Sequence, residues 1–191
     1  MIMKVLKIRQ TDWLDEITNV IEAGISEIGY VVVESPVVIV HRKTQVDISI
    51  CENMDYEVVE SYNNTGTIVS NAGDVLVGHT GYIENEWQNR FIIYFSEWLK
   101  TKGLNAEAID SDIVVDGYKV CGMCVTRYGR IDYTGGIISM NVNLDHIKAI
   151  CRKPMVKVPK GLSEYGITTA EVEAMFIEFC EKDKKPNAKD F

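Results

Sequence analysis

D-I-V-V-D-G-Y-K-V-C-G-M-C, residues 112–124, is a stretch in which two apolar runs flank an Asp-Gly pair. The first run is β-branched at residues 113–115, and Asp116-Gly117 tolerates the positive φ that a tight type I′ turn requires. The stretch therefore predicts a β-hairpin. Because Lys119 follows the turn almost directly, we expect it to lie on a strand and not on a free loop.

Lys119 is the candidate functional residue of this hairpin. Period-two alternation places it on one strand face with Cys121 and Met123, and places Gly122 on the other face. A partly desolvated ammonium on a rigid strand, next to a glycine that a ligand can approach closely, suits a negatively charged acyl or phosphoryl group. The alternative interpretation is a solvent-facing lysine on a half-buried strand.

Composition and charge indicate a soluble globular chain. Of its 191 residues, 46% are apolar and 25% are charged, which fits one domain over residues 1–182 and a flexible, Lys- and Asp-rich tail over residues 183–191. The formal net charge of -8 argues against nonspecific binding to nucleic acid or to an anionic membrane. No apolar run approaches the roughly 20 residues that cross a bilayer, so we expect a cytoplasmic location.

The cysteines and histidines do not predict a metal site. The five cysteines are scattered and odd in number, which does not indicate a disulfide framework. Cys121 and Cys124 form a C-G-M-C pair, but zinc requires further ligands, and residues three apart on a strand point to opposite faces. The histidines are dispersed along the chain, at His41, His79 and His146.

The hydrophobic pattern predicts several short strands and about four helices. Strands are expected at residues 30–33, 37–40, 57–61, 67–69, 75–77, 106–109 and 137–142. Helices are expected at residues 11–23 with Thr11 as the cap, at 84–102, at 145–150, and after a capping box of Thr168 and Glu171. Residues 128–136, with Gly135-Gly136, are expected to form a loop. Regular strand-helix alternation and a G-x-G-x-x-G motif are both absent, so the pattern predicts an α+β domain with helices packed on a mixed, largely antiparallel sheet.

Two turns rich in glycine and asparagine bracket the strand expected at residues 67–69. They span residues 63–66 and 71–74. Their backbone N–H groups could face a ligand, and two ordinary β-turns are the other interpretation.

The order of these pieces resembles the catalytic domain of the lipoate-protein ligase and biotin-protein ligase superfamily, which also contains octanoyltransferases. Residues 112–122 resemble the family's Asn-Asp, strand and Gly-x-Lys-hydrophobic-x-Gly segment, and residues 65–77 fall where the family has its glycine-rich, substrate-cradling motif. Residues 35–40 resemble an early strand, and residues 141–145, followed by Lys157, resemble the end of the domain. The resemblance extends over about residues 12–180.

This resemblance implies a fold, an activity and a set of site residues. Lys119 would be catalytic, contacting the acyl carbonyl and the phosphate of an acyl-adenylate. Asp112 would help to place ATP and Mg²⁺. The implied substrate is lipoate or lipoyl-AMP, and the implied acceptor is a lysine of a lipoyl domain or an H protein. Substrate- or cofactor-binding positions are expected at Gly66, Ser70, Asn71, Gly73, Asp112 and Gly122.

The chain departs from the family in its glycine-rich motif. Glu60 and Ser61 stand where lipoate ligases have two arginines, and Ser70-Asn71 stands where they have a histidine-aspartate pair. Two alternatives therefore stay open. One is an octanoyltransferase that forms a thioester on Cys151, with a nearby cation lowering the thiol pKa, and the other is a catalytically inactive binding module with the same fold.

Two kinds of protein partner follow from the same resemblance. We expect no counterpart of the extra C-terminal domain that some lipoate ligases carry, so activation of lipoate with ATP could require a separate accessory chain. An acceptor could dock on Lys153, Lys157 and Lys160, although a plain solvated loop is the other interpretation of these lysines.

Overall fold

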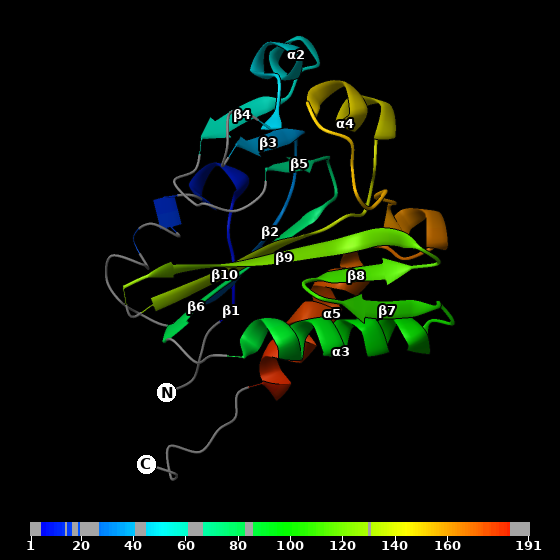
Figure 1. Cartoon of the computed structure of the whole chain (residues 1–191). Helices are drawn as coiled ribbons and strands as arrows, with labels where there is room; N and C mark the ends of the chain where they lie inside the picture. The colour runs from blue at the N-terminus through cyan, green and yellow to red at the C-terminus, as the bar shows by residue number, and fades with distance from the viewer. Residues whose placement is uncertain are drawn as a thin grey trace.

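The computed structural model describes residues 5–13, 15–16, 19, 27–40, 45–60, 67–82, 86–129 and 131–183. Its strands form two sheets (Figure 1). The large sheet has the spatial order β1 (Val5–Lys7), β2 (Ile28–Val32), β6 (Val75–Tyr82), β10 (Ile131–Ile138), β9 (Tyr118–Tyr128), β8 (Asp112–Val115) and β7 (Ala106–Ile109). The small sheet has the order β4 (Glu57–Glu60), β3 (Val37–Val40) and β5 (Ile68–Ser70).

Helices connect and cover these sheets. The α-helices with described bounds are α2 (Ile48–Asn53), α3 (Trp87–Thr101), α4 (Leu144–Ile150) and α5 (Thr169–Lys182), and two 3-10 helices are η1 (Gln10–Asp12) and η3 (Leu162–Tyr165). In the large sheet β1 and β2 run parallel while the other neighbours are antiparallel, and β3 pairs with one parallel and one antiparallel neighbour. The predicted α+β fold with a mixed, largely antiparallel sheet is therefore confirmed.

Alternating side chains bury both faces of the large sheet. In β6, Val75 and Val77 join a core with the buried faces of α3 and α5, whereas Leu76 joins a second core with Val37 and Ile39 of the small sheet. Successive side chains of a strand point to opposite faces, so one apolar run serves two layers. The large sheet lies between the α3/α5 helix pair and the small sheet (Figure 1).

The small sheet is covered on its other face as well. Val38 and Val40 of β3 pack with Cys51 of α2 and Ile150 of α4 in a third core. Both faces of β3 are therefore buried, as its unbroken Val-Val-Ile-Val run requires. The order of layers is α3 and α5, large sheet, small sheet, then α2 and α4 (Figure 1).

The central hairpin is confirmed. β8 and β9 pair antiparallel across Asp116 and Gly117, whose φ angles are 50° and 85°. Two successive positive φ values are the signature of a type I′ turn, and Asp-Gly tolerates them at low cost.

Several local predictions need correction. Residues 128–136 are mostly strand and not a loop, and the predicted strand 137–142 ends at Ile138. Gly136 lies within β10, and no larger residue fits there because a Cβ would be 2.7 Å from the carbonyl oxygen of Gly122 and would collide with Met123 Sδ. The glycine at this position therefore reflects close packing between β10 and β9. The sequence pattern also missed β1 and α2.

The N-terminal end also differs from the prediction, whereas the flexible tail expected at residues 183–191 stays a prediction. Thr11 lies inside the 3-10 turn Gln10–Asp12 and does not cap it, and much of the helix expected at residues 11–23 falls outside the described ranges. Asp183, expected to begin a flexible tail, accepts a hydrogen bond from Arg90 Nε at 2.6 Å. Residues 184–191 lie outside the described part of the chain. None of the described helices is long and apolar enough to cross a membrane.

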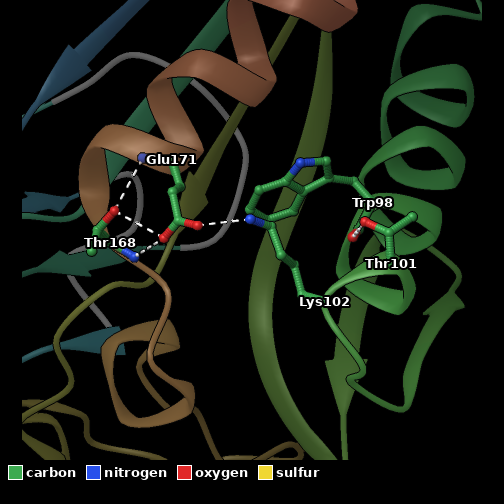
Figure 2. Close-up of polar contacts among 5 residues, drawn as sticks. All are labelled: Trp98, Thr101, Lys102, Thr168 and Glu171. Atoms are coloured by element: carbon green, nitrogen blue, oxygen red, sulfur yellow. Dashed lines mark hydrogen bonds and ion pairs between the residues drawn. The ribbon is translucent and has the colours of Figure 1, made fainter.

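An ion pair joins the C-terminal end of α3 to the N-terminal end of α5 (Figure 2). Lys102 Nζ lies 2.7 Å from Glu171 Oε1 and 5.0 Å from the ring centroid of Trp98. The other oxygen of Glu171 accepts hydrogen bonds from the backbone N–H and the hydroxyl of Thr168, so the predicted capping box is confirmed. The hydrogen bond from Lys102, followed by those from Thr168, lowers the pKa of Glu171 to about 2.

This ion pair and capping box predict a pH-dependent stability. Glu171 has a lower pKa in the folded protein than its usual 4.5, so its contribution is complete above pH 4.5 and is lost as pH falls through about 2. We expect Glu171→Gln to lower the melting temperature most above pH 4.5, and the difference from wild type to shrink toward pH 2. Circular dichroism melts across this range measure it. Glu97→Gln, which breaks an exposed pair within α3, is the control, and a Glu171→Gln effect that is independent of pH would contradict the assignment.

Candidate functional site

A pocket of about 480 Å³ lies between the two sheets. Its walls come from β5, β9 and β10, from α4, and from the segment 151–159 that follows α4. Five of the residues singled out from the sequence line it: Asn71, Asp112, Lys119, Gly122 and Cys151. The structure therefore brings together side chains from four separate parts of the chain.

A β-bulge sets the direction of Lys119. Val114 pairs with Lys119, but Ile113 pairs with Cys121, so β9 carries Val120 as an extra residue. A bulge shifts the alternation of the strand that contains it. Lys119 accordingly lies over Gly122, because a Cβ on Gly122 would be 2.5 Å from the Nζ of Lys119. The expectation that Lys119 shares a face with Cys121 was wrong, since simple alternation does not anticipate the extra residue.

Asp112 holds two lysines at the pocket. Its Oδ1 lies 2.7 Å from Lys119 Nζ, and its Oδ2 lies 2.8 Å from Lys157 Nζ. Burial opposes ionisation of Asp112, but the hydrogen bonds and charges of the two lysines outweigh it and hold the pKa of the carboxyl below its usual range. The site therefore combines one carboxylate with two ammonium groups.

Asp74, the last residue of the turn expected at residues 71–74, is a buried carboxylate at the pocket wall. Its Oδ1 accepts hydrogen bonds from the backbone N–H groups of Met140 at 2.6 Å and Asn141 at 3.0 Å. Its Oδ2 accepts from the Asn71 N–H at 2.8 Å and the Ser70 hydroxyl at 3.2 Å. Burial raises the pKa of Asp74 to about 6 against the opposing effect of these bonds, so the carboxylate is ionised at neutral pH and connects two pocket segments.

Two predicted binding positions, Ser70 and Gly73, have other surroundings. Ser70 is fully buried and donates to Asp74, and is not among the pocket-lining residues. The N–H of Gly73 donates to the carbonyl of Val33 at 2.8 Å, and the carbonyl of Gly73 accepts from the Thr169 hydroxyl at 3.0 Å. Both backbone groups of Gly73 thus fix the turn within the fold. Gly66 lies outside the described residues.

Cys151 lines the pocket, but its surroundings do not activate the thiol. Burial raises the pKa of Cys151, whereas the sequence-based expectation was that a nearby cation would lower it. Arg152, the neighbouring cation, lies 3.5 Å from Asp47 Oδ2. Cys124 also lines the pocket and donates from its Sγ to the carbonyl of Gly135 at 3.3 Å.

Among the described residues, no group of three or more His, Cys, Asp or Glu side chains could hold a metal ion.

Lys157 is the pocket residue whose position the sequence did not predict. The sequence predicts an acceptor-docking lysine or a lysine of a solvated loop at this position, because no local pattern connects residue 157 to residue 112, 45 residues away.

Comparisons with known proteins give the same picture of the fold. The sequence matches the family model described as Lipoyl protein ligase A/B catalytic domain over residues 13–179. A bi-partite lipoate protein ligase from Thermoplasma acidophilum superposes with a TM-score of 0.79 at 12% identity, over 95% of this chain and 83% of that chain. No curated protein matches the chain in sequence.

Two further solved structures carry ligands. Lipoate-protein ligase A bound with ATP gives a TM-score of 0.78 at 13% identity, over 95% of this chain and 85% of that chain. A T. acidophilum protein with bound lipoic acid gives 0.74 at 13% identity, over 95% and 86% of the two chains. At these identities the similarity establishes the fold.

Gly122→Ala should disturb the contact between Lys119 and Asp112 without destabilising the fold. An alanine Cβ would force the Nζ of Lys119 away from Asp112, and the displaced atoms are the end of a flexible side chain. We expect the pKa of Asp112 to rise with little change in melting temperature. NMR titration of the Asp112 carboxyl measures this, with the exposed Val125→Ala on the same strand as control. An unchanged Asp112 pKa would show that Lys119 does not need the open glycine.

Asp74→Ala should destabilise the protein strongly. It leaves four donors around Asp74 without their acceptor, and each such loss in a buried place costs about 1–3 kcal/mol. We expect unfolding free energy to fall by at least about 2 kcal/mol in urea titrations. Asp74→Asn keeps one carbonyl oxygen and should lose less. Equal stability of wild type and Asp74→Ala would refute a structural role for this carboxylate.

Proposed function

Because the chain belongs to the lipoyl protein ligase A/B catalytic-domain family, we propose that it is a lipoate-protein ligase-like acyltransferase. In this proposal it activates a lipoyl-type acid with ATP and transfers the acyl group to a lysine of an acceptor lipoyl domain. The observation that carries the proposal is Lys119, held by Asp112 at 2.7 Å over Gly122 in a pocket between two sheets.

Lys119 supplies the fixed positive charge of the proposed reaction. First the acid carboxylate attacks the α-phosphorus of ATP, and pyrophosphate leaves. The acceptor amine then attacks the acyl carbonyl, the carbon–oxygen bond to phosphate breaks, and AMP leaves. Negative charge develops on the carbonyl oxygen in the second step, and the ammonium of Lys119 stabilises it without reorganisation because Asp112 and the strand already fix it.

The residues present fit a nucleotide. Two ammonium groups and a carboxylate face the pocket, and lysines bind phosphate oxygens as point charges. Mg²⁺ commonly binds through one or two carboxylates together with substrate phosphates and water. Asp112, the carboxylate expected to help place it, already gives one oxygen to each of two ammonium groups, so among the described residues this carboxylate fits the lysines and not a further cation. Asn71, which lines the pocket and donates from its side-chain amide to the Asn141 carbonyl, would contribute to the wall around the substrate.

Two alternatives differ in how the pocket is used. Cys151 lines the same pocket as Lys119, so a thioester route remains a second candidate, although burial raises the pKa of its thiol and lowers the thiolate fraction. A binding module without catalysis is the third candidate, because Ser70 and Asn71 replace the histidine-aspartate pair to which the resemblance pointed.

Two protein partners belong to the proposal. The acceptor is a lipoyl domain or an H protein, which fits the description of the Thermoplasma structure as a bi-partite ligase and its lipoyl domain. The same description supports a separate accessory chain for this protein. Val156, between the lining residues Met155 and Lys157, is 98% exposed, so an acceptor can contact the chain beside these two lining residues.

Thermal melting followed by a transfer assay tests the proposal. Lipoyl-AMP, or lipoate with ATP and Mg²⁺, should raise the melting temperature of wild type by binding the native state. Lys119→Ala should abolish that shift and slow transfer to a lipoyl domain by roughly 100-fold or more. The exposed Lys148→Gln on α4 should behave as wild type.

Each alternative has its own outcome in this assay. Octanoyl-carrier protein and no ATP should give an acyl adduct in mass spectra only if the thioester route operates, and Cys151→Ser should then lose it. Binding of lipoyl-AMP without transfer, even with an added accessory chain, would support the binding module. No stabilisation by any acyl ligand at millimolar concentration would refute the ligase proposal.

A further inference from the structure

We propose that Lys157 and Lys119 together form a two-lysine subsite for an acylated nucleotide, in which Lys119 takes the acyl carbonyl and Lys157 takes the adjoining phosphate. Asp112 holds both ammonium groups in place before the ligand arrives. This inference rests on the proposed function and deepens it, because it gives the phosphate, which the family resemblance assigns to Lys119 alone, to a second lysine on a different segment of the chain.

The side-chain geometry places the two lysines as a pair. Asp112 offers one oxygen to each, at 2.7 Å for Lys119 and 2.8 Å for Lys157, so the two ammonium groups flank a single carboxylate. Both lysines line the pocket, and they are the pocket-lining lysines among the residues that the structure describes. About one third of each side chain is exposed, at 34% and 30%. A ligand in the pocket can therefore reach both.

The backbone fixes the same pairing independently of the side chains. The Lys119 N–H donates to the carbonyl of Val158 at 2.9 Å, and the Lys160 N–H donates to the carbonyl of Lys119 at 3.0 Å. Residues 157–160 thus run beside the start of β9 as a short parallel bridge, with Lys119 opposite Pro159. A parallel bridge uses the neighbours of the opposite residue, here Val158 and Lys160, so the missing N–H of Pro159 leaves both hydrogen bonds intact. Lys157 is held next to Lys119 by the chain itself.

Charge and donor count indicate which ligand the pair suits. Each ammonium has three N–H donors, and Asp112 uses one from each lysine. Two cations and one carboxylate leave one net positive charge, which matches the single charge of the phosphate in an acyl-adenylate. The carbonyl oxygen and the phosphate oxygens of that ligand lie on either side of one bridging oxygen, so two adjacent donors can bind them together. The carboxylate of a free acid carries the same single charge, but it is one group and offers no separate phosphate for the second lysine.

Lys160 is not part of this subsite. Its Nζ lies 4.3 Å from the ring centroid of Tyr165 and 5.3 Å from that of Tyr118, and it does not line the pocket. Cation–π contacts with two rings keep this ammonium away from Asp112. Of the lysines on the segment after α4, Lys157 is the one that the geometry assigns to the phosphate.

Binding constants for Lys157→Gln test the assignment. In calorimetric titrations, the variant should bind lipoyl-AMP roughly 10- to 100-fold more weakly than wild type, because a charge-assisted hydrogen bond is lost. Its affinity for lipoate alone should be unchanged, since Lys119 remains. Lys148→Gln on the neighbouring helix is the control for a lost surface charge. Melting temperatures without ligand show whether the variant is folded.

The other outcomes decide against the subsite or against the function. Equal weakening of lipoate and lipoyl-AMP in Lys157→Gln would mean that Lys157 only positions Asp112 and Lys119, and would overturn the proposal. An unchanged affinity for lipoyl-AMP would overturn it too. If wild type binds neither acyl ligand, the ligase proposal fails, and inorganic pyrophosphate becomes the probe. Roughly 10-fold weaker pyrophosphate binding by the variant would still support a phosphate subsite, whereas equal binding, or none by wild type, would end it.

Discussion

Both faces of the central strands in the large sheet are buried, and the arrangement of the other layers depends on this constraint. Val75 and Val77 of β6 pack toward α3 and α5, whereas Leu76 packs toward the small sheet. A sheet that is apolar on both faces needs two covers. Helices provide one and a second sheet provides the other. The pocket follows from this, because it lies where β5 of the small sheet faces β9 and β10 of the large one.

Two carboxylates hold the walls of this pocket together, and each joins segments that are far apart in the chain. Asp74 binds the start of β6 to the segment that leaves β10, through the N–H groups of Met140 and Asn141. Asp112 binds the hairpin to the segment after α4, through Lys157. Buried carboxylates persist when they accept enough hydrogen bonds. The hydrogen bonds of Asp74 all come from neighbouring parts of the fold. Asp112 instead binds two lysines that keep further N–H donors available in the pocket.

Local sequence signals predicted the parts of the fold that depend on neighbouring residues. The Asp-Gly turn, the capping box of Thr168 and Glu171, and the apolar stripe of α3 each involve residues within a few positions of one another. The loop predicted at Gly135-Gly136 was wrong, because glycine occurs both in turns and where strands pack closely. Only the contacts with Met123 and Gly122 of the neighbouring strand show which case applies at Gly136. The bulge at Val120 was missed for a similar reason, since it is defined by the register against β8.

The sequence by itself determined the α+β class and the central hairpin, and it indicated Lys119 as the candidate residue, because hydrophobic period, turn chemistry and a family-like motif are all properties of short stretches. The tertiary structure alone decided that Lys119 lies over Gly122, that Asp74 connects to a segment 66 residues away, and that Lys157 meets Asp112 across 45 residues. Contacts of that kind depend on sheet order, on strand register and on the path of a connecting segment. These are properties of the packed chain, and no window of the sequence contains them.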